Sequence, residues 1–163
     1  MYKTKLNKIW NLIDKIKNDI TLPIVSDFLE WFYEKLDLNF NKKNPNLELQ
    51  KWDIFYVNLW KNIWSELNKI RPCIIYSKKF ANKWNTTVII PLRSHKWKIN
   101  KNLFILIEKN NTNKLELNSI IDITWIRQVS KKRIKGFIWK ISNKDLLKID
   151  KKVIKIYWIK NKE

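Results

Sequence analysis

Residues 52–59 read Trp52-Asp53-Ile54-Phe55-Tyr56-Val57-Asn58-Leu59, and they contain the first of five short apolar runs in the chain. The other runs are Cys73-Ile74-Ile75-Tyr76, Thr87-Val88-Ile89-Ile90, Leu103-Phe104-Ile105-Leu106-Ile107 and Ile120-Ile121-Asp122-Ile123. Runs of this length that are rich in β-branched and aromatic residues are typical of strands. Because polar turns separate them, they predict a compact antiparallel barrel or sandwich rather than βαβ units.

Helical patterns flank this β-rich region on both sides. Residues 3–20 carry apolar side chains at spacings of three and four, which predicts an amphipathic helix. Ser26 and Asp27 are candidate caps for a second helix, and a linker is expected over 39–46. Near the C-terminus, Ser142 and Asp145 fit a capping box. The predicted buried stripe of that last helix comprises Leu146, Ile149, Val153 and Ile156.

Near residue 50 the sequence changes from helical patterns and a linker to short apolar runs. We therefore expect an N-terminal helical extension with its linker over 1–48, and a second domain over 49–163. No run approaches the ~18 consecutive apolar residues of a membrane span, and the N-terminus lacks an apolar signal core. A soluble, cytoplasmic protein without membrane contact is expected. The lone Cys73 cannot form an internal disulfide, so we expect a buried structural thiol.

Tryptophan and glycine are used in unusual proportions. The chain has 10 Trp and 1 Gly, whereas average usage gives roughly 11 Gly at this length. Trp64, Trp84 and Trp97 lie in polar, turn-like settings that favour glycine because they call for a positive φ. We hypothesise that UGA codons that mean glycine in the source organism are translated here as Trp.

The formal net charge of +19 favours a polyanionic partner such as nucleic acid. However, 30 of the 34 basic residues are lysines, and Lys, Asn and Ile make up 76 of the 163 residues. The codons of these three residues all begin with two A/T bases, so drift in base composition alone would produce this enrichment. Charge therefore supports binding to a polyanion and indicates nothing more specific.

Four segments in order resemble the MazF/PemK family of toxin endoribonucleases. Trp52-Asp53-Ile54 resembles the family's opening Gly-Asp-Ile strand if Trp52 stands for glycine. Trp64-Ser65-Glu66 is similar to its Gly-Ser-Glu loop, which leads at this spacing into Arg71-Pro72 and an apolar strand. Ile90-Pro91-Leu92-Arg93-Ser94 resembles the strand that ends in Pro-Leu-Thr-Ser, and the last segment is Ile126-Arg127-Gln128-Val129-Ser130-Lys131-Lys132-Arg133-Ile134. The resemblance covers about residues 50–160.

This resemblance implies an α+β fold: a small antiparallel, SH3-like, PemK-type β-barrel with a C-terminal helix, here preceded by the two-helix extension. It also implies metal-independent cleavage of single-stranded RNA, in which the ribose 2′-OH attacks the neighbouring phosphorus. Arg71 matches the family's catalytic arginine, whose guanidinium can hold two phosphate oxygens at once. Glu66, in the same loop, is a candidate for accepting a proton or orienting Arg71.

One position departs from the family pattern. The family's catalytic Thr falls on Arg93, and the nearest hydroxyl is that of Ser94. Neighbouring side chains in a strand point to opposite faces, so Ser94 replaces the Thr only if the strand ends or twists there. Either the site is rebuilt around Arg71 and Arg93 or activity is reduced. His95 has a suitable unperturbed pKa for proton transfer, although a lone loop histidine is usually just exposed.

The remaining candidates concern binding and partners. We expect Arg93, Arg127 and Arg133 to contact RNA, with no metal or other cofactor. The resemblance implies three partners: single-stranded RNA, an acidic antitoxin protein and a second copy of the chain in a homodimer. Two alternatives stay open: a non-catalytic nucleic-acid-binding module on the same barrel, and a protein-directed toxin like CcdB.

Overall fold

The computed structural model describes residues 2–15, 22–41, 43, 45–60, 69–95, 102–111 and 113–157. The chain divides into two compact units, Met1–Lys42 and Lys43–Glu163. Within the described residues, no helix is long and apolar enough to cross a membrane.

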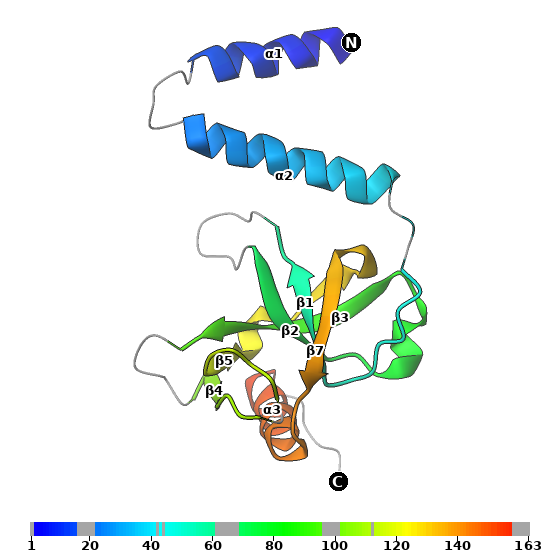
Figure 1. Cartoon of the computed structure of the whole chain (residues 1–163), viewed down its shortest axis with the longest axis vertical. Helices are drawn as coiled ribbons and strands as arrows, with labels where there is room; N and C mark the ends of the chain where they lie inside the picture. Colours follow the sequence, from blue (N-terminus) through cyan, green and yellow to red (C-terminus); the bar gives the residue numbers. More distant parts are fainter. Residues whose placement is uncertain are drawn as a thin grey trace. The chain divides into compact units, whose positions relative to one another are not determined.

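The N-terminal unit consists of two helices, α1 (Tyr2–Lys15) and α2 (Leu22–Phe40) (Figure 1). The helix expected to start at the Ser26 cap begins earlier, so that cap assignment is wrong. Pro23 lies in its first turn, where the missing N–H leaves no hydrogen bond unmade. Helix α2 also runs into the predicted linker. It leaves large apolar side chains exposed, among them Phe28, Phe32 and Phe40.

The second unit is an antiparallel sheet of seven strands, in which β4-β5-β3-β2-β1-β7 is the order and β6 pairs with β3 (Figure 1). The strands are β1 (Asp53–Asn58), β2 (Ile70–Ile75), β3 (Thr86–Ser94), β4 (Phe104–Ile107), β5 (Ser119–Asp122), β6 (Arg127–Ser130) and β7 (Ile134–Lys140). Short 3-10 helices span Lys79–Lys83, Ile123–Trp125 and Lys131–Arg133. The predicted antiparallel α+β fold is confirmed.

Strand β3 pairs with different strands along its length. Its first half pairs with β6, for example Ile89 with Arg127, and its middle pairs with β2 through Pro91 and Cys73. Its last three residues pair with β5 instead, where Ser94 is opposite Ser119. The end of β3 therefore pairs with a different strand from its first half and its middle.

The core consists of two apolar clusters. One contains Ile54, Ile74, Ile90 and Ile121 together with the buried side of the C-terminal helix α3 (Asn143–Ile156). The other contains Val57, Ile75, Ile89 and Cys73. Cys73 is a buried free thiol, as predicted, and burial raises its pKa while Arg71 and Arg127 oppose that rise.

Helix α3 begins as its capping signal predicts. The Ser142 hydroxyl accepts a hydrogen bond from the Asp145 N–H at 3.2 Å and donates one to the Asp145 carboxylate at 2.8 Å. Ile149 and Val153 are buried, and Leu146 and Ile156 pack against the same cluster. The predicted apolar stripe is confirmed.

Among the described residues, four non-glycine residues have a positive φ, and two of them are tryptophans. Trp52 has φ 81° and Trp60 has φ 66°, whereas the single Gly136 does not have a positive φ. The expectation for Trp84 is wrong, because its φ of −84° is in the extended region that any residue adopts. Trp64 and Trp97 lie outside the described residues.

Candidate RNA-binding site

Arg71 lies near the start of β2. It is opposite Val57 of β1, and the next residue, Pro72, is opposite Tyr56. Pro72 has no N–H to donate, but it fits because the pairing of β2 with β3 begins only at Cys73. The sheet therefore fixes the backbone of Arg71, which is half-buried.

Arg93 and Ser94 are the last two residues of β3, where the strand pairs with β5. Neighbouring side chains on a regular strand point to opposite faces. Here both residues line the same cavity, at the point where the strand ends. That Ser94 supplies the hydroxyl of the family's threonine stays a prediction.

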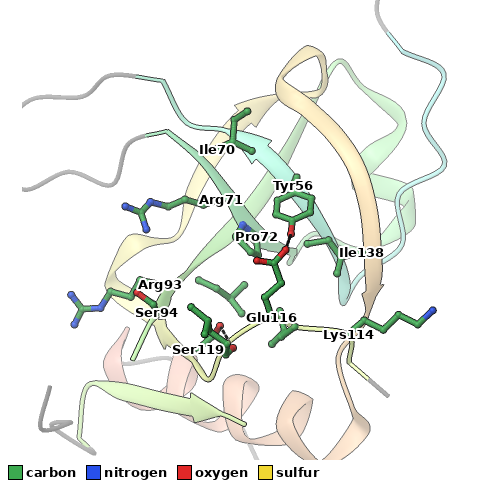
Figure 2. A pocket seen from close by; sticks show the side chains of 13 residues that line it. Tyr56, Ile70, Arg71, Pro72, Arg93, Ser94, Lys114, Glu116, Ser119 and Ile138 are labelled. Carbon is green, nitrogen blue, oxygen red and sulfur yellow. Dashed lines mark hydrogen bonds between the residues drawn. The ribbon is translucent and has the colours of Figure 1, made fainter. Parts of the chain in front are cut away.

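The cavity shared by Arg71, Arg93 and Ser94 has a volume of about 260 Å³. The guanidinium groups of Arg71 and Arg93 extend toward the same side of it, whereas Lys114 extends toward the opposite side (Figure 2). The Arg93 guanidinium carbon is 5.0 Å from the centroid of the Phe104 ring, a cation–π contact that helps to orient it. Two arginines that border one cavity favour an anionic ligand such as a phosphate.

A tyrosine and a glutamate that sequence reasoning missed also line this cavity. The Tyr56 hydroxyl, from β1, donates a hydrogen bond to the Glu116 carboxylate at 3.0 Å (Figure 2). Burial raises the pKa of Tyr56, and the hydrogen bond to Glu116 and its negative charge add to the rise. Glu116 lies between β4 and β5, in a polar stretch with no local signal for a site. Only the folded sheet brings it to the cavity that Arg71 also lines.

Glu66 and His95 are not placed in the cavity. Glu66 lies outside the described residues. His95 directly follows β3, is exposed, and its backbone N–H donates to the Asn118 carbonyl at 3.0 Å. It is not among the described residues that line the cavity. Its role in proton transfer stays a prediction.

Arg127 and Arg133 lie close to each other but do not line the cavity. Arg127 is on β6, and the Arg133 guanidinium carbon is 3.7 Å from the centroid of the Trp60 ring. Burial lowers the pKa of Arg133, and the nearby charge of Arg127 lowers it further. Arg133 stays cationic at neutral pH because an arginine pKa is so high. The contact of both arginines with RNA stays a prediction.

In the described part of the chain, no group of three or more His, Cys, Asp and Glu side chains is arranged to hold a metal ion.

Comparison with known proteins gives a family and a fold. Residues 50–157 match the family model for the PemK-like, MazF-like toxin of type II toxin-antitoxin systems. No curated protein matches the chain.

Three solved structures share the fold of the second unit. MazF from Deinococcus radiodurans has a TM-score of 0.60 and 10% identity, over 70% of this chain and 100% of that one. An endoribonuclease in complex with its cognate antitoxin, from a mycobacterial species, has a TM-score of 0.55 and 12% identity, over 69% and 97%. A MazE–MazF structure from D. radiodurans has a TM-score of 0.54 and 10% identity, over 71% and 100%.

Proposed function

Since the chain belongs to the PemK-like, MazF-like toxins of type II toxin-antitoxin systems, we propose that it is a metal-independent endoribonuclease of single-stranded RNA. The observation that carries this proposal is the shared cavity of Arg71, Arg93 and Ser94. Arg71 matches the family's catalytic arginine, Arg93 stands at the position of the family's threonine, and the Ser94 hydroxyl follows one residue later.

The proposed reaction uses a nucleophile that belongs to the substrate. The ribose 2′-OH loses its proton and attacks the adjacent phosphorus, the bond to the 5′-oxygen breaks, and that oxygen takes up a proton. A 2′,3′-cyclic phosphate and a 5′-hydroxyl result. Negative charge accumulates on the phosphate oxygens during attack, and positioned guanidinium groups lower the barrier by stabilising that charge. We assign this role to Arg71 and Arg93.

Arg71→Lys is expected to separate binding from catalysis. Binding of single-stranded RNA should stay within a few fold, because one positive charge among many is conserved. Cleavage should fall by about 10²–10³, because an ammonium group cannot brace two phosphate oxygens of the transition state. The measurement is cleavage of a mixed-sequence single-stranded RNA, with binding followed in parallel.

Two comparisons sharpen this experiment. His95→Ala should reduce cleavage less than Arg71→Lys does, because His95 is not among the described residues that line the cavity. An equal loss would instead assign proton transfer to His95. Added chelator should leave the rate unchanged. Tight RNA binding without any cleavage by the unmodified chain would contradict the proposal.

A non-catalytic RNA-binding module is the second candidate. The presence of Arg93 at the family's threonine position favours it, because a cation there strengthens phosphate binding without supplying a hydroxyl at that position. The same experiment separates the two functions.

We also propose that the toxin acts as a homodimer and that an acidic antitoxin inhibits it. Two of the similar structures contain an antitoxin, and residues 43–163 carry 27 basic and 9 acidic residues. A short reading frame beside this gene that encodes an acidic protein would supply the partner to test. Its product should block RNA binding when added in equimolar amounts.

A further inference from the structure

The Tyr56–Glu116 pair lies in the proposed RNA site but has no part in the phosphate chemistry described above. The Glu116 carboxylate lies below the Tyr56 hydroxyl, between Pro72 and Ile138 (Figure 2). The arginine side chains extend away from it toward one side. The cavity is therefore lined by an acidic group as well as by Arg71, Arg93 and Lys114, although an acidic group weakens the binding of a phosphate.

The direction of the hydrogen bond determines what the pair offers to a ligand. A carboxylate can only accept hydrogen bonds, and the Tyr56 hydroxyl donates its single proton to that of Glu116 at 3.0 Å. The Tyr56 hydroxyl stays protonated at neutral pH, because its pKa is raised. This pair therefore offers a ligand hydrogen-bond acceptors and no donors. The acceptors are the remaining lone pairs of the carboxylate and of the hydroxyl oxygen.

Much of the remaining lining is apolar and suits the faces of a flat ring, and Ser94, Lys114 and Ser119 add polar groups to it. Apolar side chains line the cavity together with Pro72: Ile70, Leu92, Leu115, Leu117 and Ile138. Its volume of about 260 Å³ is below the range of roughly 300–1,000 Å³ typical of pockets for drug-sized ligands. A single base that is unstacked from its strand is a ligand of this smaller kind, and proteins commonly hold such bases between apolar walls.

We propose that this cavity is a base-recognition site that selects guanine, an inference that rests on the proposed binding of single-stranded RNA. The Watson–Crick edge of guanine presents two adjacent donors, N1–H and the N2 amino group, which match an acceptor-only carboxylate. Adenine and cytosine each present one donor beside an acceptor, and uracil presents one donor between two acceptors. Those acceptors would face the lone pairs of Glu116 and Tyr56. Arg71 and Arg93 then bind the phosphate beside the guanine.

The test measures binding of the full chain to short single-stranded RNAs that are uridine throughout, except for one central guanine, adenine, cytosine or inosine. A 2′-fluoro group replaces every 2′-hydroxyl, so that no cleavage interferes. The guanine strand should bind about 10-fold more tightly than the adenine, cytosine and all-uridine strands. Inosine lacks the N2 amino group, and its strand should fall in between.

Three variants link the preference to the pair. Glu116→Gln keeps the shape of the side chain but replaces one carboxylate acceptor with an amide donor. The preference for guanine should therefore fall to within about twofold. Tyr56→Phe should reduce it in part, because the carboxylate loses the hydroxyl that orients it. Glu108→Gln makes the same charge change at an exposed residue that is not among the described lining of the cavity, and it should leave the preference intact.

The outcomes distinguish this inference from the proposed enzyme. Equal binding of all strands, a preference for another base, or a guanine preference that survives Glu116→Gln would each overturn the inference, even if the chain cleaves RNA. A guanine preference that Glu116→Gln removes would support it even if the all-ribose strands are not cleaved. Failure to bind any strand would overturn both proposals.

Discussion

Trp52 and Trp60 have a backbone conformation that suits glycine. Their φ angles of 81° and 66° bring Cβ close to the backbone, and this conformation costs a non-glycine residue about 1–2 kcal/mol. The rings nevertheless make contacts: Trp52 packs edge-on against Tyr76 with centroids 5.4 Å apart, and Lys51 Nζ lies 4.0 Å from its centroid. A change of Trp52 to glycine therefore relieves strain but also removes these contacts.

A pair of variants isolates the strain. Trp52→Gly and Trp52→Ala both remove the ring, and they differ only in Cβ. We expect the glycine variant to be more stable by about 1 kcal/mol, measured as the free energy of unfolding in urea. At Trp84, where φ is −84°, the order should reverse by about 0.5–1 kcal/mol, because glycine loses more backbone entropy on folding. Equal stabilities at Trp52 would contradict the strain argument.

The recoding hypothesis has a separate test. If the codons for the ten tryptophans are UGG, the hypothesis is wrong. If they are UGA, a tryptic peptide of the natural protein that covers residue 52 should contain glycine by mass spectrometry.

At the scale of single side chains, sequence reasoning selected some of the residues that line the candidate site and missed others, including Tyr56 on β1. Arg71 and Arg93 were predicted because they stand in motifs that resemble those of the family, and both line the cavity. Glu116 was missed because loop residues carry no periodicity. Its partner Tyr56 is 60 positions away in the sequence, and only the strand order brings the two together.

A helix or strand could be predicted from the sequence where its signal lies in residues close together in the chain. The cap of α3 was predicted from Ser142 and Asp145, three residues apart, and the structure confirms it. The β6 and β7 strands were missed, because polar and charged residues leave only short apolar stretches there. In β7 only Ile134 is buried, and Lys135 and Lys140 are exposed. A strand of this kind is recognised only from its pairing with β1.

The contact between the end of β2 and α3 should make stability depend on alkaline pH. The Tyr76 hydroxyl donates to Asp150 on α3 at 3.2 Å. Burial, followed by the charge and hydrogen bond of Asp150, raises the pKa of Tyr76 to about 12. A folded-state pKa above the unfolded value of about 10 stabilises the fold fully below pH 10, and this stabilisation is lost as the pH rises toward 12.

We therefore expect Tyr76→Phe to weaken the dependence of stability on pH in the alkaline range. The stability difference between the unmodified chain and the variant should be constant below about pH 10 and should shrink between about pH 10 and 12. Thermal unfolding across this pH range measures it. Tyr33→Phe, at a side chain that is 71% exposed, is the matched control. A difference that does not change with pH would contradict the assignment.

For the molecule as a whole, the charge is divided unequally between the two units. Residues 1–42 contain 7 basic and 6 acidic residues, a formal charge of +1, whereas residues 43–163 have a formal charge of +18. The part of the chain that matches the toxin family therefore carries nearly all of the positive charge. Counterion release from RNA depends on cations near its phosphates, so the N-terminal helices should contribute little to it.

This division predicts that residues 43–163 fold and bind RNA without the N-terminal unit. The truncated chain should unfold in one cooperative transition, because both apolar clusters of the core lie within it. The slope of the logarithm of RNA affinity against the logarithm of salt concentration should match that of the full chain to within about one, since one phosphate contact contributes roughly that much. Circular dichroism on heating and fluorescence anisotropy at several salt concentrations measure the two properties. Aggregation or a non-cooperative transition would show that α1 and α2 are needed for folding, and a much shallower slope would place phosphate contacts on them.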